Sequence, residues 1–427
     1  MEKTITFYTL GCRLNQSETA VISRQFELSG YRVVDFNQPA DYVVINTCTV
    51  TAHGDADTRH LVNKANRINP QTKIALIGCQ AQVQKEKLTK LPNVRLVVGN
   101  GEKMNLVNIL QEIELSEEPI VITPPIEKKS FTIPVAGIDP HRTRANLKIQ
   151  DGCDFFCTFC EIPYARGRAR SRVFDDILCE AKILAQAGYK EVVLTGVNMG
   201  TYGYEGKGIL DVIDDLKKIE GLKRIRISSI EPTTAPFELI ERMGEGKLCR
   251  YLHIPLQSGS DEILKSMQRK YSKKEFADFI HRAYAAVPEI CIGTDIIVGF
   301  PGETDEHFQE TLEFVRNLPL AYFHVFSYSD RSFNKSRTFS KKVPARTIQE
   351  RSQILRDLSL QKRLEFSQKF IGTTQKVLFE EKKSNYWFGL TDHYLRVKLA
   401  SLQDLQNKIL TVYLGQMDGQ IFTASLL

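Results

Sequence analysis

The sequence lacks the features that would place it in a membrane or send it out of the cell. No stretch approaches the roughly 20 consecutive apolar residues that a transmembrane helix needs. The N-terminal residues Met1–Thr4 show neither the apolar segment nor the small-residue cleavage site of a signal peptide. With 42% hydrophobic and 25% charged residues, the composition also excludes a mostly disordered or fibrous chain. We therefore expect a cytoplasmic globular protein with no membrane partner.

The sequence also has little net charge and no even set of cysteines. The net charge is +6, from 57 basic and 51 acidic residues, so the distribution of the charges is more informative than their sum. Nine cysteines, an odd number in a chain without an export signal, argue against a disulfide framework. Thiolate ligands or reactive thiols are the expected alternative.

A length of 427 residues suits about three domains. Short apolar runs and helical patterns alternate through residues 1–115, which predicts an α/β domain with a parallel sheet. Proline is frequent in residues 116–140, which we interpret as a linker with some extended structure. Residues 141–366 contain six strand–helix units and suit a partial parallel (βα)6 barrel. The strands of this barrel are expected near 146–150, 191–196, 224–230, 251–257, 291–299 and 322–329.

The tail, residues 367–427, contains five closely spaced predicted strands, which are typical of a small OB-like β-barrel. The segment 330–376 around its start holds twelve Lys or Arg and four acids, a net charge of +8 that exceeds that of the whole chain. Basic charge beside exposed aromatic residues is typical of nucleic-acid binding. A solvated helix face and a barrel core are the alternative. The aromatic residues in question are Tyr386, Trp387, Phe388 and Tyr394.

Cys153, Cys157 and Cys160 form a C-x3-C-x2-C motif just after the first predicted strand of the partial barrel. Three thiolates on one loop can hold three irons of a [4Fe–4S] cluster and leave the fourth iron open for a substrate or cofactor. The loop lies at the C-terminal mouth, where barrels of this kind keep their chemistry. A structural zinc site is the alternative, but no fourth Cys or His follows at short spacing.

Cys12, Cys48 and Cys79 are distant in sequence, but each follows the end of a predicted strand in the first domain. Because the C-terminal ends of parallel strands share one edge of a sheet, we expect these thiols to converge. Gly11 and Gly78 precede two of them and permit a bulky group to approach the backbone. Together the three predict a second cluster, although each alone would suit a buried core position. The other cysteines are predicted core residues: Cys179, Cys249 and Cys291.

With two cysteine sets in this order and a small barrel behind them, the chain resembles the radical S-adenosylmethionine methylthiotransferases over essentially its whole length. Its first signature is Tyr8–Glu18, YTLGCRLNQSE, and its tail resembles a TRAM domain, a small RNA-binding β-barrel. The resemblance implies two [4Fe–4S] clusters, two molecules of S-adenosylmethionine per turnover, and a reducing partner such as flavodoxin or ferredoxin. It further implies that the cluster on the three-cysteine loop cleaves S-adenosylmethionine, and that the cluster of the first domain supplies sulfur to the substrate.

Finer features favour one branch of this family. The opening Thr9–Gln16 resembles the branch that acts on threonylcarbamoyladenosine in the anticodon stem-loop of tRNA. The stretch after Arg166–Gly167 is wholly basic, whereas the branches that act on isopentenyladenosine or on a ribosomal-protein aspartate usually carry an acid there. Those two substrates are the alternatives within the family, and a zinc-stabilised RNA-binding module without catalysis is the alternative outside it.

The threonylcarbamoyl group bears a carboxylate, which an arginine of this basic stretch could bind in a bidentate manner. RNA phosphates or carboxylates of the barrel itself are the alternative partners of these arginines. The candidate substrate-binding residues are Arg166, Arg168, Arg170 and Arg172.

Candidate contacts to S-adenosylmethionine lie where successive barrel strands end. Glycine permits close approach there, and amide, hydroxyl and carboxylate groups can bind the cofactor. Each of these residues alone would also suit a turn or a helix cap. The predicted contacts are Gly196, Asn198, Ser229, Glu231, Gln257 and Asp295.

Overall fold

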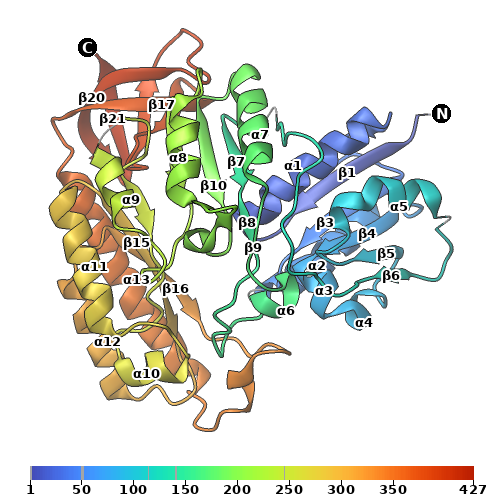
Figure 1. Ribbon diagram of the computed structural model, residues 1–427, viewed down its shortest axis with the longest axis horizontal. Coiled ribbons are helices and arrows are strands. Elements are labelled where there is room, and N and C mark those ends of the chain that lie inside the picture. The colour runs from blue at the N-terminus through green and yellow to red at the C-terminus, as the bar shows by residue number, and fades with distance from the viewer. Residues whose placement is uncertain (1, 50–51, 114, 140–141, 245) are drawn as a thin grey trace.

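The computed structural model describes residues 2–49, 52–113, 115–139, 142–244 and 246–427. It has three parts: a parallel-sheet domain at the N-terminus, a central open barrel and a C-terminal closed barrel (Figure 1). This arrangement confirms the predicted α/β class with a small barrel at the end of the chain. Among the described residues, no helix combines the length and apolar character needed to traverse a bilayer.

The N-terminal domain is a six-stranded parallel sheet with the order β2-β1-β3-β4-β5-β6. Because side chains alternate along a strand, Val44 packs on one face of the sheet and Ile45 on the other. The strands are β1 (Thr4–Thr9), β2 (Arg32–Val33), β3 (Tyr42–Thr47), β4 (Lys73–Gly78), β5 (Val94–Val98) and β6 (Ile120–Ile122). One face is covered by α1 (Arg13–Leu28) and α5 (Leu106–Glu112), the other by α2 (Ala52–Ile68), α3 (Cys79–Val83) and α4 (Lys85–Leu88).

The edge strand β6 comes from the segment that was predicted to be a linker. It pairs in parallel with β5 from Leu96–Ile120 to Val98–Ile122. Pro119 and Pro124 bracket an apolar stretch only long enough for one short edge strand, because proline cannot donate to a ladder. Such a stretch is too short to be recognised by its periodicity. The predicted domain end at residue 115 therefore falls short of the sheet, which extends beyond it.

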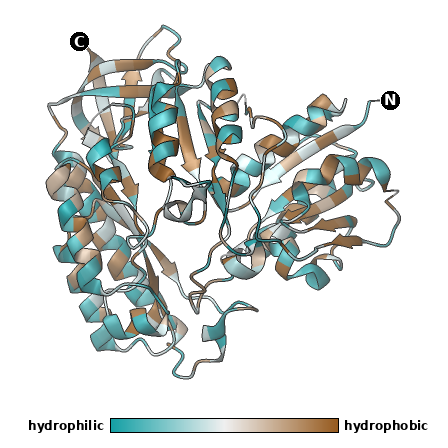
Figure 2. Cartoon of the chain, in the orientation of Figure 1, coloured by the Kyte–Doolittle hydropathy of each residue, from teal (hydrophilic) through white to brown (hydrophobic). Residues whose placement is uncertain are grey.

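The central open barrel consists of six parallel strands in two three-stranded sheets, β13-β10-β7 and β14-β15-β16. All six strands expected from the sequence are present. Helices cover the outside of the barrel. Their outward faces are largely hydrophilic, and the strands beneath them are apolar (Figure 2). The strands are β7 (Arg144–Lys148), β10 (Glu191–Thr195), β13 (Arg224–Ile227), β14 (Tyr251–His253), β15 (Cys291–Val298) and β16 (Tyr322–Ser327). The main helices are α7 (Phe174–Gln186), α8 (Ile209–Lys218), α11 (Lys273–Ala286), α12 (Asp305–Asn317) and α13 (Ala345–Gln368).

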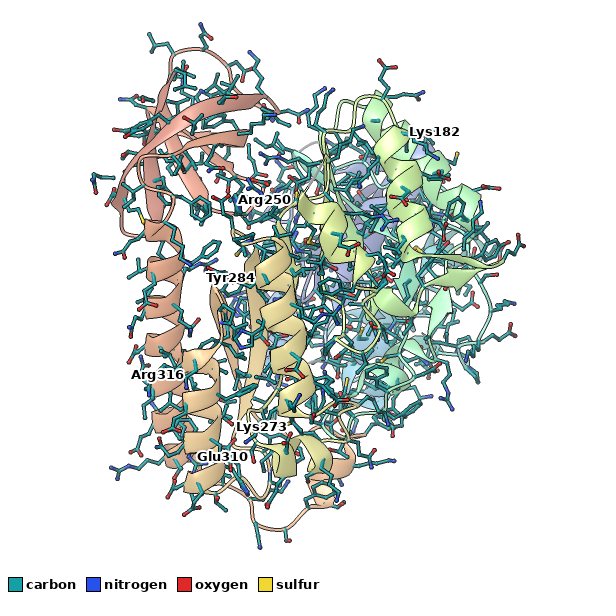
Figure 3. All side chains as sticks on the ribbon, turned by 60° about the vertical axis from the view of Figure 1, so that its left-hand side comes forward. Lys182, Arg250, Lys273, Tyr284, Glu310 and Arg316 are labelled. Carbon is teal, nitrogen blue, oxygen red and sulfur yellow. The ribbon has the colours of Figure 1, made fainter. Side chains whose placement is uncertain are left out.

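The C-terminal closed barrel has the strand order β17-β18-β19-β21-β20, with β20 pairing back to β17. It sits across the end of the central barrel opposite the mouth. Arg250 lies where the two barrels meet (Figure 3). Its guanidinium binds Asp392 of the closed barrel at 2.8 Å and Glu289 of the central barrel at 2.7 Å. The strands are β17 (Thr374–Lys383), β18 (Tyr386–Leu390), β19 (Arg396–Ala400), β20 (Ile409–Asp418) and β21 (Ile421–Leu426).

The expected exposed aromatic surface of the closed barrel is wrong for two of its four residues. Tyr386 is 42% exposed and Phe388 is half-buried, but Trp387 is only 6% exposed and packs in the barrel core. Tyr394 turns towards the central barrel, where its ring centroid lies 5.2 Å from that of Tyr251. Neighbouring residues of β18 face opposite sides of the barrel wall, so consecutive aromatics cannot all be exposed.

The three cysteines that belong to neither predicted set fall into two groups. Cys249 and Cys291 are buried, which confirms their prediction as core residues. Cys179 is exposed on α7, so its prediction was wrong. Ile177 and Ala181 of α7 face the core, and a residue two positions from each lies on the other side of a helix.

Candidate functional site

A cavity of about 180 Å³ lies at the mouth of the central barrel, beside the three-cysteine loop. Cys160 lines it, and so do Gln257 and Asp295 from the ends of neighbouring strands. Gln257 has a positive φ of 78°, a strained conformation for a residue other than glycine that is typical of functional sites. Hydrogen bonds hold it there, because its N–H donates to the Asp295 carbonyl at 2.7 Å.

The three cysteines of the loop lie between β8 (Gln150–Asp151) and α6 (Ile162–Arg166). Burial raises the pKa of Cys153 to about 11, and it also raises the pKa values of Cys157 and Cys160. These thiols stay neutral unless a positively charged group binds them, and a metal deprotonates a thiol outright.

A guanidinium group supports this loop from the barrel side. Nη1 of Arg269 donates to Sγ of Cys157 at 3.3 Å, and the same guanidinium pairs with the carboxylate of Glu231. Hydrogen bonds to cysteine sulfur are among the means by which proteins tune iron–sulfur clusters. Sequence reasoning missed Arg269, which lies more than 100 residues from the loop and has no motif of its own.

The thiols of Cys12, Cys48 and Cys79 lie at one edge of the N-terminal sheet, as the topology predicts. A Cβ on Gly11 would lie 2.6 Å from Sγ of Cys48, so the backbone before Cys12 lies against that thiol. Asn15 joins the ends of β1 and β3, because its Nδ2 donates to the carbonyl of Leu10, two residues before Cys12, at 2.8 Å and to that of Thr47, directly before Cys48, at 3.0 Å.

Two contacts bring the cysteine sets to a common region. Thr49, which follows Cys48, donates its hydroxyl to the carboxylate of Glu161, which follows Cys160, at 2.5 Å. Both Thr49 and Glu161 line the cavity. Arg331 binds both of these residues. Its guanidinium donates to the carboxylate of Glu161 at 3.4 Å and to the hydroxyl of Thr49 at 2.9 Å. Arg331 belongs to the basic segment assigned to RNA, so its role in joining domains was missed.

The helix α6 forms the second link between the two cysteine sets. It begins directly after Glu161, and its last residue, Arg166, enters the N-terminal domain and donates to Oδ1 of Asn15 at 2.5 Å. Asn100 approaches from the other side, with Nδ2 2.7 Å from the Ala165 carbonyl and 3.5 Å from Sγ of Cys79. The same short helix therefore contacts groups that support all three cysteines of the N-terminal set.

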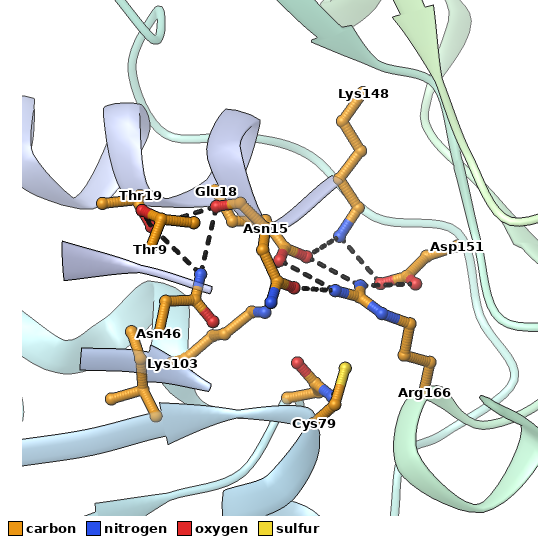
Figure 4. A network of polar contacts seen from close by, with 12 residues as sticks. Thr9, Asn15, Glu18, Thr19, Asn46, Cys79, Lys103, Lys148, Asp151 and Arg166 are labelled. Atoms are coloured by element: carbon orange, nitrogen blue, oxygen red, sulfur yellow. Dashed lines mark hydrogen bonds and ion pairs between the residues drawn. The ribbon is translucent and has the colours of Figure 1, made fainter. Parts of the chain in front are cut away.

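A buried charge network surrounds Arg166 at this junction (Figure 4). Glu18 binds Lys148 at 2.7 Å, Arg166 at 3.0 Å and also Lys103. Burial acts to raise the pKa of Glu18, but the three cations overcome it and hold the pKa far below its usual range. Asp151 binds Lys148, Arg166 and Arg170. Four cations and two acids leave a surplus of two positive charges beside Cys79, which suits an anionic thiolate-bound group.

The four candidate substrate arginines differ in their surroundings. Arg168 alone has a largely exposed side chain, 3.4 Å from Asp154. The others bind carboxylates of the protein itself, which favours the alternative reading for them, since a guanidinium already paired has little left for a substrate. Their partners are Glu18 and Asp151 for Arg166, Asp151 for Arg170, and Asp176 and Glu180 for Arg172.

The six predicted cofactor contacts also differ. Gln257 and Asp295 line the cavity, and burial raises the pKa of Glu231, which reaches the loop through Arg269. Asn198 is buried with its Nδ2 lacking a partner, and its N–H donates to Oε1 of Gln150 at 3.0 Å. The two others are Gly196, packed against Gln150, and Ser229, half-buried just after β13.

Sulfur spacing separates a cluster from a zinc ion. Zinc bonds of 2.3 Å in a tetrahedron would hold thiolates about 3.8 Å apart. Within the described part of the chain, no three cysteine sulfurs lie within 4.8 Å of one another. Neither cysteine set is therefore arranged as a compact tetrahedral zinc site.

Comparison with known proteins gives two family matches and near full-length relatives. Residues 147–315 match the radical SAM superfamily, and residues 4–99 match an uncharacterized family, UPF0004. A threonylcarbamoyladenosine tRNA methylthiotransferase MtaB of Aquifex aeolicus is 41% identical over 404 residues, 94% of this chain and 98% of that protein. The chain belongs to the radical SAM tRNA methylthiotransferases.

Other members of this methylthiotransferase family are similar over comparable lengths. The MtaB protein of Bacillus subtilis is 39% identical, covering 96% of this chain and 93% of its own. A tRNA-2-methylthio-N(6)-dimethylallyladenosine synthase of Rickettsia rickettsii is 31% identical over the full length of both chains. The protein is thus an enzyme that uses S-adenosylmethionine and an iron–sulfur cluster to modify tRNA.

Solved structures of the radical SAM superfamily share the fold. The radical S-adenosylmethionine methyltransferase TsrM of Kitasatospora setae matches with a TM-score of 0.57 at 14% identity, covering 79% of this chain and 77% of that one. The cobalamin-dependent radical enzyme OxsB matches with a TM-score of 0.55, covering 86% of this chain and 56% of that one. These likenesses bear on the fold alone.

Proposed function

We propose that this methylthiotransferase converts N6-threonylcarbamoyladenosine, beside the anticodon of tRNA, to its 2-methylthio derivative. The observation that carries the proposal is the naming of the relatives: proteins that share 41% and 39% identity over nearly the whole chain act on threonylcarbamoyladenosine by name, whereas the dimethylallyladenosine synthase shares 31%. The cytoplasm, where tRNA is modified, is the corresponding location.

We propose that each cysteine set holds one [4Fe–4S] cluster, on Cys153, Cys157 and Cys160 and on Cys12, Cys48 and Cys79. When bound, the two clusters would supply the electron that cleaves S-adenosylmethionine and the sulfur that enters the base. The contact between Thr49 and Glu161 supports a shared cavity for both, since each of these residues directly follows a cysteine of a different set.

The protein groups around this cavity would bind and orient the reactants. Gln257 and Asp295 at the cavity wall are the strongest candidates for contacts to S-adenosylmethionine. The other candidates follow the ends of β10 and β13: Gly196, Asn198, Ser229 and Glu231. The basic segment before the closed barrel and Arg168 on the surface would bind tRNA phosphates. A flavodoxin or ferredoxin would deliver the electrons.

Single cysteine variants test whether one cluster serves cofactor cleavage and the other sulfur insertion. Cys157→Ala should abolish cleavage of S-adenosylmethionine, and Cys48→Ala should retain cleavage but form no methylthio product. Cys179→Ala is the matched control, because this cysteine is exposed on α7. Iron content after anaerobic reconstitution should fall by one cluster in each of the two cluster variants. Full product formation by Cys48→Ala would remove the assignment of the sulfur donor.

The substrate is tested in a deletion strain by mass spectrometry of digested tRNA. Loss of the 2-methylthio-threonylcarbamoyl nucleoside, with the dimethylallyl derivative unchanged, is the expected result. Loss of the 2-methylthio-dimethylallyl nucleoside instead would assign the enzyme to the branch that acts on dimethylallyladenosine. Unchanged tRNA with an unmodified ribosomal protein would overturn the assignment to tRNA.

A further inference from the structure

The interior of the central barrel contains a guanidinium without a counter-charge. Arg13 directly follows Cys12 and begins α1, and its side chain is half-buried. In the part of the chain that the structure describes, this side chain has neither an ion pair nor a hydrogen bond. A half-buried arginine with no acid beside it is unusual, because burial penalises an unpaired charge.

A second arginine beside it is also without an acid. Alternation along β13 places Arg226 on the interior face, since Ile225 and Ile227 pack outward under the helices. The guanidinium of Arg226 is held between two rings, with Cζ 3.9 Å from the centroid of Tyr251 and 3.5 Å from that of Tyr394. Its Nε and Nη1 are buried without a hydrogen-bond partner. The stacking fixes its position but does not neutralise its charge.

The nearby carboxylates are already bound to other groups. Glu380 of the closed barrel pairs with Arg144. Glu191 lies 3.9 Å from Arg224 and also accepts a hydrogen bond from the hydroxyl of Tyr394. The positive charge of Arg226 acts on Arg13, so the two guanidinium groups share this region of the barrel. Among the described residues, Arg13 and Arg226 are therefore both without a carboxylate partner, and an anionic ligand would supply one.

We propose that Arg13 binds the carboxylate of the threonylcarbamoyl group and that Arg226 supplies the second positive charge beside it. A guanidinium and a carboxylate match in shape and can form two parallel hydrogen bonds. The threonylcarbamoyl arm is slim and ends in its carboxylate, so it can extend from a flipped base into the barrel. A backbone phosphate could enter only together with the sugars on either side of it. Since Arg13 adjoins Cys12, an arm anchored there would hold the base close to the N-terminal cysteine set.

This inference rests on the proposed substrate and makes Arg13 a determinant of specificity. Loss of a buried charge-assisted contact reduces affinity by about tenfold or more. The test uses the reconstituted full-length enzyme and two anticodon stem-loop RNAs, one with the natural threonylcarbamoyl carboxylate and one with the carboxamide. With Arg13→Gln, KM for the carboxylate RNA should rise about tenfold or more, with a smaller change in kcat. For the carboxamide RNA, wild type and variant should agree within about twofold.

Three controls separate this role from a structural one. Arg13→Lys keeps the charge and should recover part of the lost affinity, and the iron content of all variants should match that of wild type. Lys182→Gln removes an exposed positive charge on α7 and should leave KM unchanged (Figure 3). The KM for S-adenosylmethionine, measured from cofactor cleavage, should not change in Arg13→Gln.

Several outcomes would overturn the inference. Equal losses on both RNAs, or a loss of iron in Arg13→Gln, would show that Arg13 supports the cluster or the fold. A raised KM for S-adenosylmethionine would assign the arginine to the carboxylate of that cofactor. If wild-type enzyme forms no methylthio product on threonylcarbamoyl RNA, the proposed function fails first, and the inference fails with it.

Discussion

Replacement of Glu18 by glutamine tests whether the buried charge network holds the N-terminal domain against the central barrel. The substitution keeps the shape of the side chain but removes its charge, and it leaves Asp151 as the remaining acid for four cations. The network surplus then rises from two to three positive charges. Removal of one partner from a buried ion pair costs about 3–5 kcal/mol. Such a loss is a large part of the 5–15 kcal/mol by which a typical domain is stable.

Amide hydrogen exchange in α1 is the suitable measurement, because unfolding of a three-part chain need not be a single transition. A loss of about 3 kcal/mol would accelerate exchange through opening by roughly 100-fold. Glu27→Gln is the control on the same helix, since Glu27 pairs with Arg24 at the surface with both side chains 40% exposed. Its effect should stay within about 0.5 kcal/mol. Equal exchange in the two variants would refute the role assigned to the network.

Two further predictions concern the sheet edge and the closed barrel. In Gly11→Ala the new Cβ would lie 2.6 Å from the Cys48 sulfur, so iron content should fall by one cluster, whereas Gly30→Ala, with a similar φ of 85° and open space around it, should keep both. Burial lowers the pKa of His393 from 6.5 to about 4, below its unfolded value. Barrel stability should therefore be intact above about pH 6.5 and decline by up to roughly 3 kcal/mol as the pH falls to 4. Fluorescence of Trp387, the single tryptophan, should report this decline, and His393→Gln should flatten it.

The sequence predicted those parts of the site that follow from local pattern and sheet topology. The loop of Cys153 has diagnostic spacing, and the strand ends before Cys12, Cys48 and Cys79 meet because parallel strands share one edge. The strand periodicity located all six barrel strands to within a few residues, because buried parallel strands are nearly continuous apolar runs.

The partners of the charged residues could not be predicted in this way. A run of arginines after the loop has the same sequence pattern whether it binds RNA or protein carboxylates. Arg166 is separated by 148 residues from Glu18, its partner, and only the folded chain brings them together. The same limit applies to Arg331, which lies 276 residues from Asp55 and 2.8 Å from it in space. Pairing over such separations is a property of the tertiary structure and leaves no local periodicity.

The position of the two cysteine sets relative to each other is set by the junction and not by either domain alone. Each set is assembled on strand ends or a loop within its own domain, so each could bind its cluster even if the domains moved apart. The polar contacts that cross the junction include Thr49 with Glu161 and Arg331, Glu18 with Lys148, Asn100 with Ala165, and Arg166 with Asn15 and Glu18. Polar contacts fix geometry through direction as well as energy. A weakened junction should therefore leave iron content and cofactor cleavage near wild-type levels while the methylthio product per cofactor cleaved falls. Parallel losses of cleavage and product in Glu18→Gln would show instead that the network supports the cluster itself.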